Sequence, residues 1–431
     1  MRVPRLPLLL LVAGLAGCRC GAPGARSGKG GVAVEVIDPE ELGRTTAAAE
    51  REPNDTRKHA QELPLEGGVE GTIGAGKPER GDADWYRVTV GADDQILTAT
   101  LSGIAELDLV LEAWSASARL MRVSNGKEGE GETLVNLSAA RGESYLLVRE
   151  AKGRSAGGRY RLSYKLRPIE EGEEREPNYR ASLASPLPLG GEATGYLGWH
   201  TDTDWYRVNL EGSLAADGAR LRVEYDGLDE VRANLSLRSA VGAVLQERSG
   251  AGGEPIILAN LAASEGQREL FVVVRCGYQA NVETRYSIRV SSTVPPGPTE
   301  AEPNDTPATA TPILPGTLLS GTLGDTADRD LYLVKASPQS SGPMRVTVTP
   351  PLGLDVAVAV VGEDGKPLLE LDEGQPREPE TIPALELRGG KALVQVRAPR
   401  RQSLNAVSPY RIRVDPLPAG RWEREPNGSA G

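Results

Sequence analysis

The chain has 431 residues, of which 39% are hydrophobic and 25% are charged, and its formal net charge at pH 7 is −11. Nucleic acids and anionic membrane surfaces attract basic proteins, so this charge argues against both as partners and suits divalent cations. The 51 glycines and 32 prolines fit many turns between short strands.

The chain begins with a segment that resembles a bacterial lipoprotein signal. A basic stretch at 1–5 precedes an apolar run at 6–15 that is too short to span a bilayer. The sequence Leu-Ala-Gly-Cys18 follows and matches the Leu-small-small-Cys lipobox of such signals. The resemblance implies removal of residues 1–17, acylation of Cys18 and a lipid anchor that holds the exported protein in the cell envelope, at the outer membrane or the cell surface. The alternative is an ordinary secretory signal.

A tether is predicted next, because residues 18–47 are rich in Gly, Ala, Arg and Ser. A flexible chain of this length reaches roughly 30 Å. The two remaining cysteines are Cys20 in the tether and Cys276 in a predicted strand. They allow a disulfide in an oxidising compartment, and the alternative is a buried thiol at Cys276.

The tripeptide Glu-Pro-Asn occurs four times, and another glutamate stands two residues before each copy. The copies begin at Glu52, Glu176, Glu302 and Glu425, at intervals of 124, 126 and 123 residues. Asp-x-Asp-Trp-Tyr follows the first copy at 82–86 and returns after the second and, with leucine in place of tryptophan, after the third. The chain is therefore a tandem array.

The period decides the kind of array. Solenoid repeats have periods of about 20–50 residues, whereas a period near 124 has the size of a domain that buries its own core. We predict three domains, at 48–168, 172–293 and 298–416. A tail at 417–431 carries the fourth motif, which is either residual linker or a segment that packs back on the third domain.

The patterning within each predicted domain is that of β-strands. In 86–90, Tyr, Val and Val alternate with Arg and Thr, and 206–210 repeats the pattern. Clusters of Gly, Asn and Asp separate such runs about every 8–12 residues, which indicates a sandwich or barrel. No long segment has helical periodicity, and a short helix is predicted after the motif, as at 57–61. The fold class is all-β.

The order of the motifs resembles the bacterial pre-peptidase C-terminal domain, a jelly-roll β-sandwich related to the collagen-binding domains of clostridial collagenases. The resemblance covers roughly residues 48–416 in three copies, and it implies three tandem jelly-roll-like β-sandwich domains. In the first copy it rests on Glu-x-Glu-Pro-Asn-Asp at 50–55, Gly-Thr-Ile at 71–73, Asp-x-Asp-Trp-Tyr at 82–86, Leu-Asp-Leu at 107–109 and the closing tyrosine strand at 160–162.

The repeated acids are candidate metal ligands. Side chains two residues apart in an extended chain share one face, so Glu50, Glu52 and Asn54 are predicted to converge, as are Asp82 and Asp84. Calcium takes 6–8 oxygen ligands, whereas magnesium demands strict octahedral geometry. In the family that the chain resembles, some members bind calcium through the acidic opening motif and a later aspartate. The candidate ligands are Glu50, Glu52, Asn54, Asp55, Asp82 and Asp84; Glu174, Glu176, Asn178, Asp202 and Asp204; and Glu300, Glu302, Asn304, Asp305, Asp328 and Asp330.

The second set lacks one acid, because Tyr179 stands where Asp55 closes the first motif. A weaker or empty second site is therefore expected. The alternative for all three sets involves no metal: Asn54 and Asp55 cap a turn or short helix, Asp84 does so at a strand entry, and the glutamates are solvated linker charges.

Patterns that suggest catalysis do not form a site. Gly-Arg-Ser155-Ala-Gly matches a nucleophile elbow, but a strand rather than a helix is predicted to follow it. The only histidines, His59 and His200, do not recur. Paired carboxylates could act in a glycosidase, yet their presence in every repeat favours ion binding. Trp85 and Trp205 are adjacent to the core tyrosines in extended chain, so they are predicted to point to the opposite face of the strand. They form either an aromatic platform for carbohydrate or peptide, or packing contacts with a neighbouring strand.

These observations predict a protein without catalytic activity of its own. We expect a lipid-anchored envelope protein that binds or spaces a polysaccharide, a protein matrix or a partner protein, with calcium at the junctions between its domains. The alternative is an accessory or targeting subunit for a separate secreted peptidase, because the family that the chain resembles usually accompanies protease domains.

Overall fold

The computed structural model describes residues 47–74, 81–210, 218–262, 267–338, 342–399, 408–418, 420 and 422–426. The predicted signal, the tether, Cys18 and Cys20 lie outside these ranges. Within them the regular structure consists of strands and two short 3-10 helices, η1 (Arg57–His59) and η2 (Ala181–Leu183). The all-β prediction is confirmed, and the short helix expected after the motif is a single 3-10 turn in the first two repeats.

The first repeat pairs two five-stranded sheets. One sheet has the order β1 (Ala48–Ala49), β3 (Val69–Gly71), β10 (Tyr160–Pro168), β5 (Gln95–Leu101), β8 (Glu132–Ala139). The other has the order β2 (Gln61–Glu62), β4 (Ala83–Val90), β9 (Gly142–Glu150), β6 (Leu109–Trp114), β7 (Arg119–Val123). The residues of β4 alternate between buried and more exposed positions, as expected for a strand with one face in the core.

The second repeat has the same plan. One sheet has the order β12 (Glu192–Leu197), β19 (Asn281–Thr293), β14 (Arg220–Tyr225), β17 (Ile256–Ala262). The other has the order β11 (Ser185–Pro186), β13 (Thr203–Asn209), β18 (Glu269–Cys276), β15 (Ala233–Ser239), β16 (Val244–Gly250).

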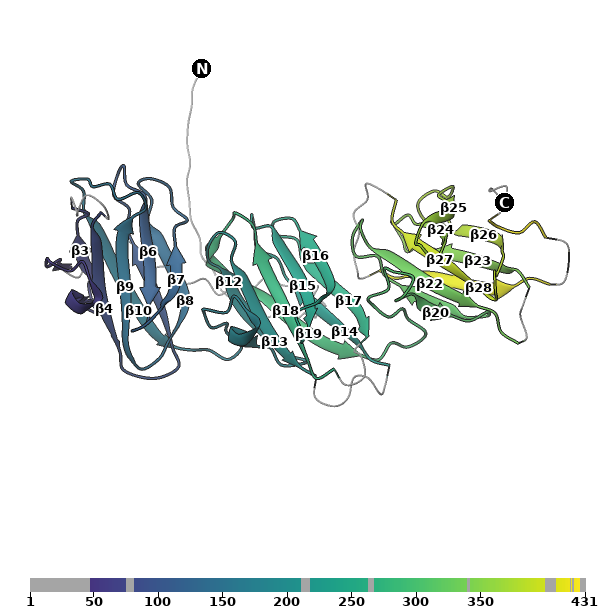
Figure 1. Ribbon diagram of the computed structural model, residues 1–431, viewed down its shortest axis with the longest axis horizontal. Helices are drawn as coiled ribbons and strands as arrows, with labels where there is room; N and C mark the ends of the chain where they lie inside the picture. Colours follow the sequence, from purple (N-terminus) through teal and green to yellow (C-terminus); the bar gives the residue numbers. More distant parts are fainter. Residues whose placement is uncertain are drawn as a thin grey trace, which may run out of the picture. The chain divides into compact units, whose positions relative to one another are not determined.

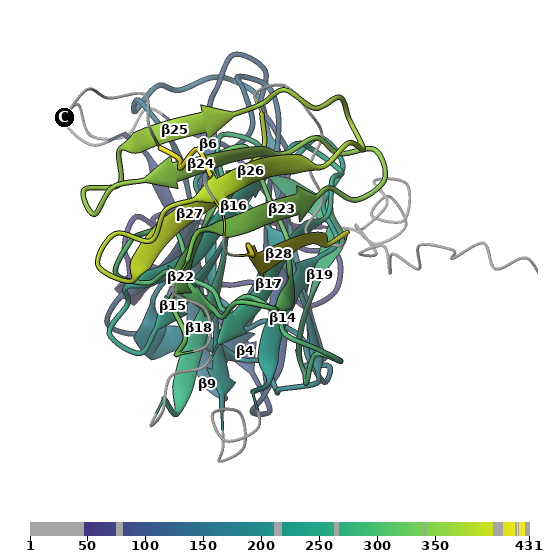
Figure 2. The ribbon, with the colours of Figure 1, turned by 90° about the vertical axis from the view of Figure 1, so that its right-hand side faces the viewer.

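The third repeat follows the same plan, and its strands from β22 onward are labelled in Figure 2. One sheet has the order β21 (Leu318–Gly321), β28 (Tyr410–Pro416), β23 (Met344–Thr349), β26 (Glu380–Leu385). The other has the order β20 (Thr311–Ile313), β22 (Arg329–Lys335), β27 (Lys391–Arg397), β24 (Ala357–Val361), β25 (Pro367–Leu371).

The strand order is that of a jelly roll in every repeat (Figure 1). When the eight main strands of a repeat are counted along the chain, one sheet has the order 1-8-3-6 and the other 2-7-4-5. This order is the double Greek key of jelly-roll sandwiches. Strands 1, 2 and 8 lie at corresponding places in each sandwich. The motif, which precedes strand 1, therefore meets the same strands in all three repeats.

Three buried clusters form the centre of the sandwiches, and each draws its residues from one repeat. Their members are Val, Leu, Ile, Ala and Tyr for the most part, with Met121, Met344 and Cys276. The predicted domain boundaries fall between these clusters, and the boundaries themselves stay a prediction. Among the described residues, no helix is long and apolar enough to cross a membrane.

Candidate metal centres at the repeated motif

The first motif lies against strands 1 and 2 of its own sandwich. Parallel pairing of β1 with β3 fixes the chain before Glu50, and the main-chain N–H of Trp85 in β4 donates to the Asn54 carbonyl at 3.1 Å. The peptide bond between Glu52 and its following proline is cis, as it is in all four motifs. The corresponding N–H groups of Trp205 and Leu331 bind the second and third motifs in the same way.

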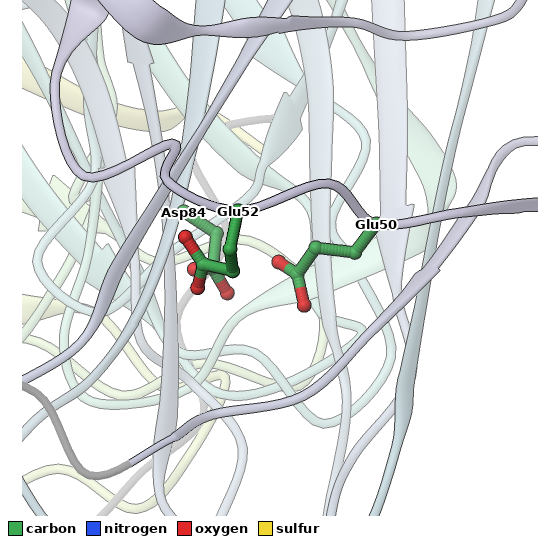
Figure 3. A group of neighbouring side chains, drawn as sticks. All are labelled: Glu50, Glu52 and Asp84. Carbon is green, nitrogen blue, oxygen red and sulfur yellow. The ribbon is translucent and has the colours of Figure 1, made fainter.

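Three carboxylates converge where the motif meets β4 (Figure 3). In the first repeat, one oxygen each of Glu50, Glu52 and Asp84 lies within 4.8 Å of the others. The same holds in the other repeats for two further groups, and we call the three groups clusters 1, 2 and 3. Cluster 2 consists of Glu174, Glu176 and Asp204, and cluster 3 of Glu300, Glu302 and Asp330. Each could hold a metal ion.

The first glutamate of each motif is held by hydrogen bonds. In cluster 1, Glu50 accepts the N–H of Thr72 at 2.9 Å, the side-chain amide of Asn54 at 3.1 Å and the hydroxyl of Tyr86 at 3.0 Å. Tyr86 also contacts the hydroxyl of Tyr160, which donates to Asp84 Oδ2 at 2.7 Å. Two buried core tyrosines thus reach the cluster from β4 and β10.

A glycine in strand 1 makes room for this arrangement. A Cβ atom on Gly71 would collide with the Tyr160 ring and the Glu50 carboxylate. A Cβ on Gly195 or Gly321 would meet the corresponding glutamate and tyrosine hydroxyls. The Gly-Thr pair that recurs in the sequence is therefore part of the site in the first and third repeats.

Other oxygens of the clusters are buried and have no hydrogen-bond partner among the described residues. They include the side-chain amide oxygens of Asn54, Asn178 and Asn304, all fully buried. They also include Oδ1 of Asp84, Asp204 and Asp330 and, in cluster 2, Oε1 of Glu176. An unpaired buried polar group costs about 1–3 kcal/mol. The same two atom types lack a partner in every repeat, which is compatible with an ion at each cluster.

The surroundings of the clusters favour protonated carboxyls when no cation is present. Burial raises the pKa of Asp84 to about 9, and the charges of Glu50 and Asp82 add to this increase although the Tyr160 hydrogen bond opposes it. Burial likewise raises the pKa of Glu302 to about 9. In cluster 2, burial raises the pKa of all three carboxyls well above their ordinary values. A bound divalent cation would reverse this effect, because it stabilises the ionised form.

The preceding repeat supplies a hydrogen-bond donor to each of clusters 2 and 3. Asn136, in β8 of the first repeat, donates its side-chain amide to Glu174 at 3.2 Å, and Asn260 does the same for Glu300 at 2.9 Å. Main-chain bonds join the same segments, since the N–H of Glu176 donates to the Asn136 carbonyl at 3.0 Å. No local sequence signal pointed to these two asparagines. Both have a positive φ, 54° and 61°, a conformation that asparagine adopts more readily than most residues.

The remaining predicted ligands lie beside the clusters. Asp82 directs its carboxylate to the main-chain N–H groups of Gly74 and Ala83, and Asp202 makes the equivalent bonds. The sequence left a capping role open for Asp84. In the structure the first aspartate of the Asp-x-Asp pair has this role instead. Asp55 is exposed, and Asp305 accepts a main-chain N–H at 3.3 Å.

The second motif keeps its full cluster although it lacks an aspartate at its end. Tyr179, which takes that position, is 50% exposed and lies outside the three converging carboxylates. Its substitution therefore changes the rim of the site rather than the cluster. A weaker second site stays a prediction.

Several other features of the sequence are resolved by the fold. Trp85 packs against Trp114 with ring centroids 5.5 Å apart, and Trp205 packs against Phe271 with centroids 5.6 Å apart. These contacts match the packing alternative. Cys276 is buried in β18, and its thiol contacts the Trp199 carbonyl at 3.2 Å.

The residues of the catalytic patterns make no described contact with one another. Ser155 lies in the loop between β9 and β10, so the helix that a nucleophile elbow requires does not follow it. His59 and His200 are both exposed and lie in different repeats.

The fourth motif packs on the third repeat. The N–H of Glu425 donates to the Ala384 carbonyl at 2.8 Å, and the Glu425 carbonyl accepts the N–H of Glu386 at 2.9 Å. These bonds match those that Glu176 makes to the first repeat. Because Ala384 replaces the asparagine found at 136 and 260, the amide donor is missing here.

Comparisons with known proteins give distant structural likenesses only. No family model and no curated protein matches the chain. The chain is similar to a triple jelly-roll protein from the turret of an archaeal virus, at 9% identity and a TM-score of 0.22, over 86% of this chain and 95% of that one. It is also similar to the CUB1-EGF-CUB2 domain of human MASP-1/3, at 10% identity and a TM-score of 0.17, over 51% and 99% of the two chains. A protein of Eubacterium rectale described as secreted matches at 9% identity and a TM-score of 0.20, over 58% and 85%. Scores this low carry no argument about function.

Proposed function

We propose that the protein is a non-catalytic, calcium-binding component of the bacterial cell envelope. Its tandem sandwiches bind or space a polysaccharide, a protein matrix or a partner protein, and calcium bound at the repeated motifs stiffens the junctions between them. A lipid on Cys18 anchors the exported chain. The support for the anchor is the lipobox of the sequence, and the support for calcium is the geometry of the clusters.

One observation carries the calcium proposal. In every repeat a fully buried asparagine amide oxygen and a fully buried aspartate Oδ1 have no described hydrogen-bond partner, and both lie where two glutamates converge with that aspartate. The ligands are all oxygens and include carboxylates and an amide carbonyl. This set is typical of calcium, whereas thiolates and imidazoles, which zinc and copper prefer, are missing from the three clusters.

The position of the clusters supports a role at the junctions. Clusters 2 and 3 each receive an asparagine donor from the preceding repeat, so a cation that orders the motif also orders its contact with that repeat. Calcium bound there would oppose bending at these contacts. Stiffness of this kind suits a protein that holds a partner away from the membrane.

A thermal melt of the full chain, with free calcium raised from chelator excess to millimolar, tests the proposal. Calcium that binds the folded state alone stabilises it by about 2.7 kcal/mol per site at a concentration 100 times the dissociation constant. We expect a saturable increase in Tm that magnesium does not reproduce. Asp204→Asn should reduce the increase, and Asp364→Asn, at an exposed position, is the control. An unchanged Tm at millimolar calcium would contradict the proposal.

A further inference from the structure

One contact near the clusters differs between the two junctions. Leu111 and Leu235 hold the same place in their sheets, and β7 pairs Val123 with Leu111 where β16 pairs Arg248 with Leu235. Arg248 therefore corresponds to Val123, and the side chain that bonds to the next repeat from the first junction is Asn125, two residues further on. Asn125 and Arg248 nevertheless reach the same loop of the next repeat, since Asn125 bonds to Gly198 and Arg248 lies against Gly324. A neutral amide thus meets this loop at the first junction and a cation meets it at the second.

The amide at the first junction makes main-chain contacts only. Asn125 donates to the Gly198 carbonyl at 2.7 Å and accepts the N–H of His200 at 3.2 Å. It forms no described bond to a carboxylate of cluster 2 or to Asp202. The acids of the second repeat thus receive no positive charge from this position.

The guanidinium at the second junction forms a buried ion pair. Nη2 of Arg248 lies 2.7 Å from Oδ2 of Asp328, and the two side chains are only 9% and 7% exposed. Nη1 donates to the carbonyl of Ile257 at 2.8 Å, which fixes the guanidinium in place. A Cβ atom on Gly324 would fall on this guanidinium, so the glycine provides the space it occupies.

This ion pair is the only described salt bridge to an acid of the three sites. Asp328 raises the pKa of Glu302, after the larger effects of burial and of Glu300, so its charge acts on cluster 3. Arg248 and Asp328 also line a hollow of about 220 Å³ beside Glu302. Another cation, Arg220, lies nearby, and its charge interacts with Glu300, but its described bonds go to main-chain carbonyls and it forms no described salt bridge with an acid of cluster 3.

We propose that Arg248 is a resident counter-cation of cluster 3, so that calcium binds this cluster more weakly than cluster 2 and the second junction is held by the protein's own charge. The inference rests on the proposed calcium function. Its physical basis is simple: a fixed positive charge lowers the affinity of a neighbouring site for a divalent cation and already neutralises one of the acids that repel one another there. The cations at the first junction, Arg167 and Arg285, pair with Glu173 and not with an acid of cluster 2, so cluster 2 depends on the metal.

Calorimetric titration of the full chain with calcium chloride tests the inference, using variants that exchange the two junction residues. In the unmodified chain we expect the weakest site to bind about tenfold less tightly than the tightest, an effect expected of one nearby charge in a partly buried setting. Arg248→Asn should strengthen the weakest site by about tenfold. Asn125→Arg should weaken a tight site by a similar factor.

A second variant guards against a local folding defect. Gly324→Ala leaves Arg248 in the chain but displaces its guanidinium, so it should also strengthen the weakest site. Equal sites in the unmodified chain, with affinities unchanged in Arg248→Asn and Gly324→Ala, would overturn the inference and leave the calcium function intact. Binding to no variant, although all remain folded by circular dichroism, would overturn the proposed function and the inference together.

Discussion

Clusters 1 and 2 are built from the same motif, yet they differ in burial. All three acids of cluster 2 are buried, whereas Glu52 of cluster 1 is exposed and Glu50 is half-buried. The difference comes from the preceding repeat, which covers cluster 2 and supplies Asn136. Cluster 1 has no corresponding cover among the described residues. The motif therefore determines which oxygens converge, and the neighbouring sandwich determines how far they are removed from water.

The largest effect expected from this difference is on pH dependence. Carboxyls whose pKa burial raises on folding, such as Asp84 and Asp204, stabilise the metal-free protein at low pH, below their unfolded pKa near 4, and lose that contribution as the pH rises through their folded values. Metal-free stability should therefore fall between pH 6 and about 9, and calcium should abolish most of the fall.

Urea unfolding at pH 6, 7.5 and 9, with chelator and with calcium, measures this effect. Asp204→Asn should remove more of the pH dependence than Asp84→Asn, because cluster 2 is the more deeply buried. An equal stabilisation by calcium at all three pH values, or a larger one at pH 6, would contradict the linkage of proton release to metal binding.

A smaller effect is expected when the cover of cluster 2 is removed. Asn136→Gly tolerates the positive φ of this position but removes the amide that donates to Glu174. We expect a loss of about 0.5–1.5 kcal/mol in the free energy of unfolding from the missing hydrogen bond, since the same Glu174 oxygen still accepts the N–H of Tyr196. Asn234→Gly, in a strand of the second repeat and bonded to Ser249 near the surface, is the control for removing an asparagine amide. Equal losses in both variants would show that the contact with Glu174 has no special role.

The smallest effect concerns the residue that ends the second motif. Tyr179→Asp restores the aspartate present at Asp55 and Asp305, and calorimetry should detect a change in calcium affinity of less than about threefold, since the position is exposed and its charge is screened. A tenfold increase would instead support the weaker second site predicted from the sequence.

Much of the fold was predictable from local patterns. The 124-residue period matches the interval at which the jelly-roll strand order recurs, and the alternation at 86–90 matches the buried and more exposed positions of β4. The convergence of Glu50 with Glu52 was also predictable, because residues two apart in extended chain share a face. Asp84 joins them because the motif bonds to β4, a contact that this spacing does not give.

The parts of the site that were missed depend on contacts distant in sequence. Tyr86 and Tyr160 read as core residues, and their hydroxyls reach the cluster only because strands 2 and 8 meet the motif. Asn136 acts on a motif 38 residues away, and Arg248 on an aspartate 80 residues away. Such pairs leave no periodic pattern in the sequence, because they depend on the contact between one sandwich and the next.

A crystal structure grown with calcium would test the central claim most directly. The account predicts an anomalous difference peak in cluster 2, with the ion about 2.3–2.6 Å from the amide oxygen of Asn178 and from Oδ1 of Asp204, the atoms that otherwise lack partners. A weaker peak, or none, is expected in cluster 3 beside Arg248. The absence of a peak from cluster 2 at millimolar calcium, with its carboxyls paired to one another through protons, would contradict the claim that these motifs are metal centres.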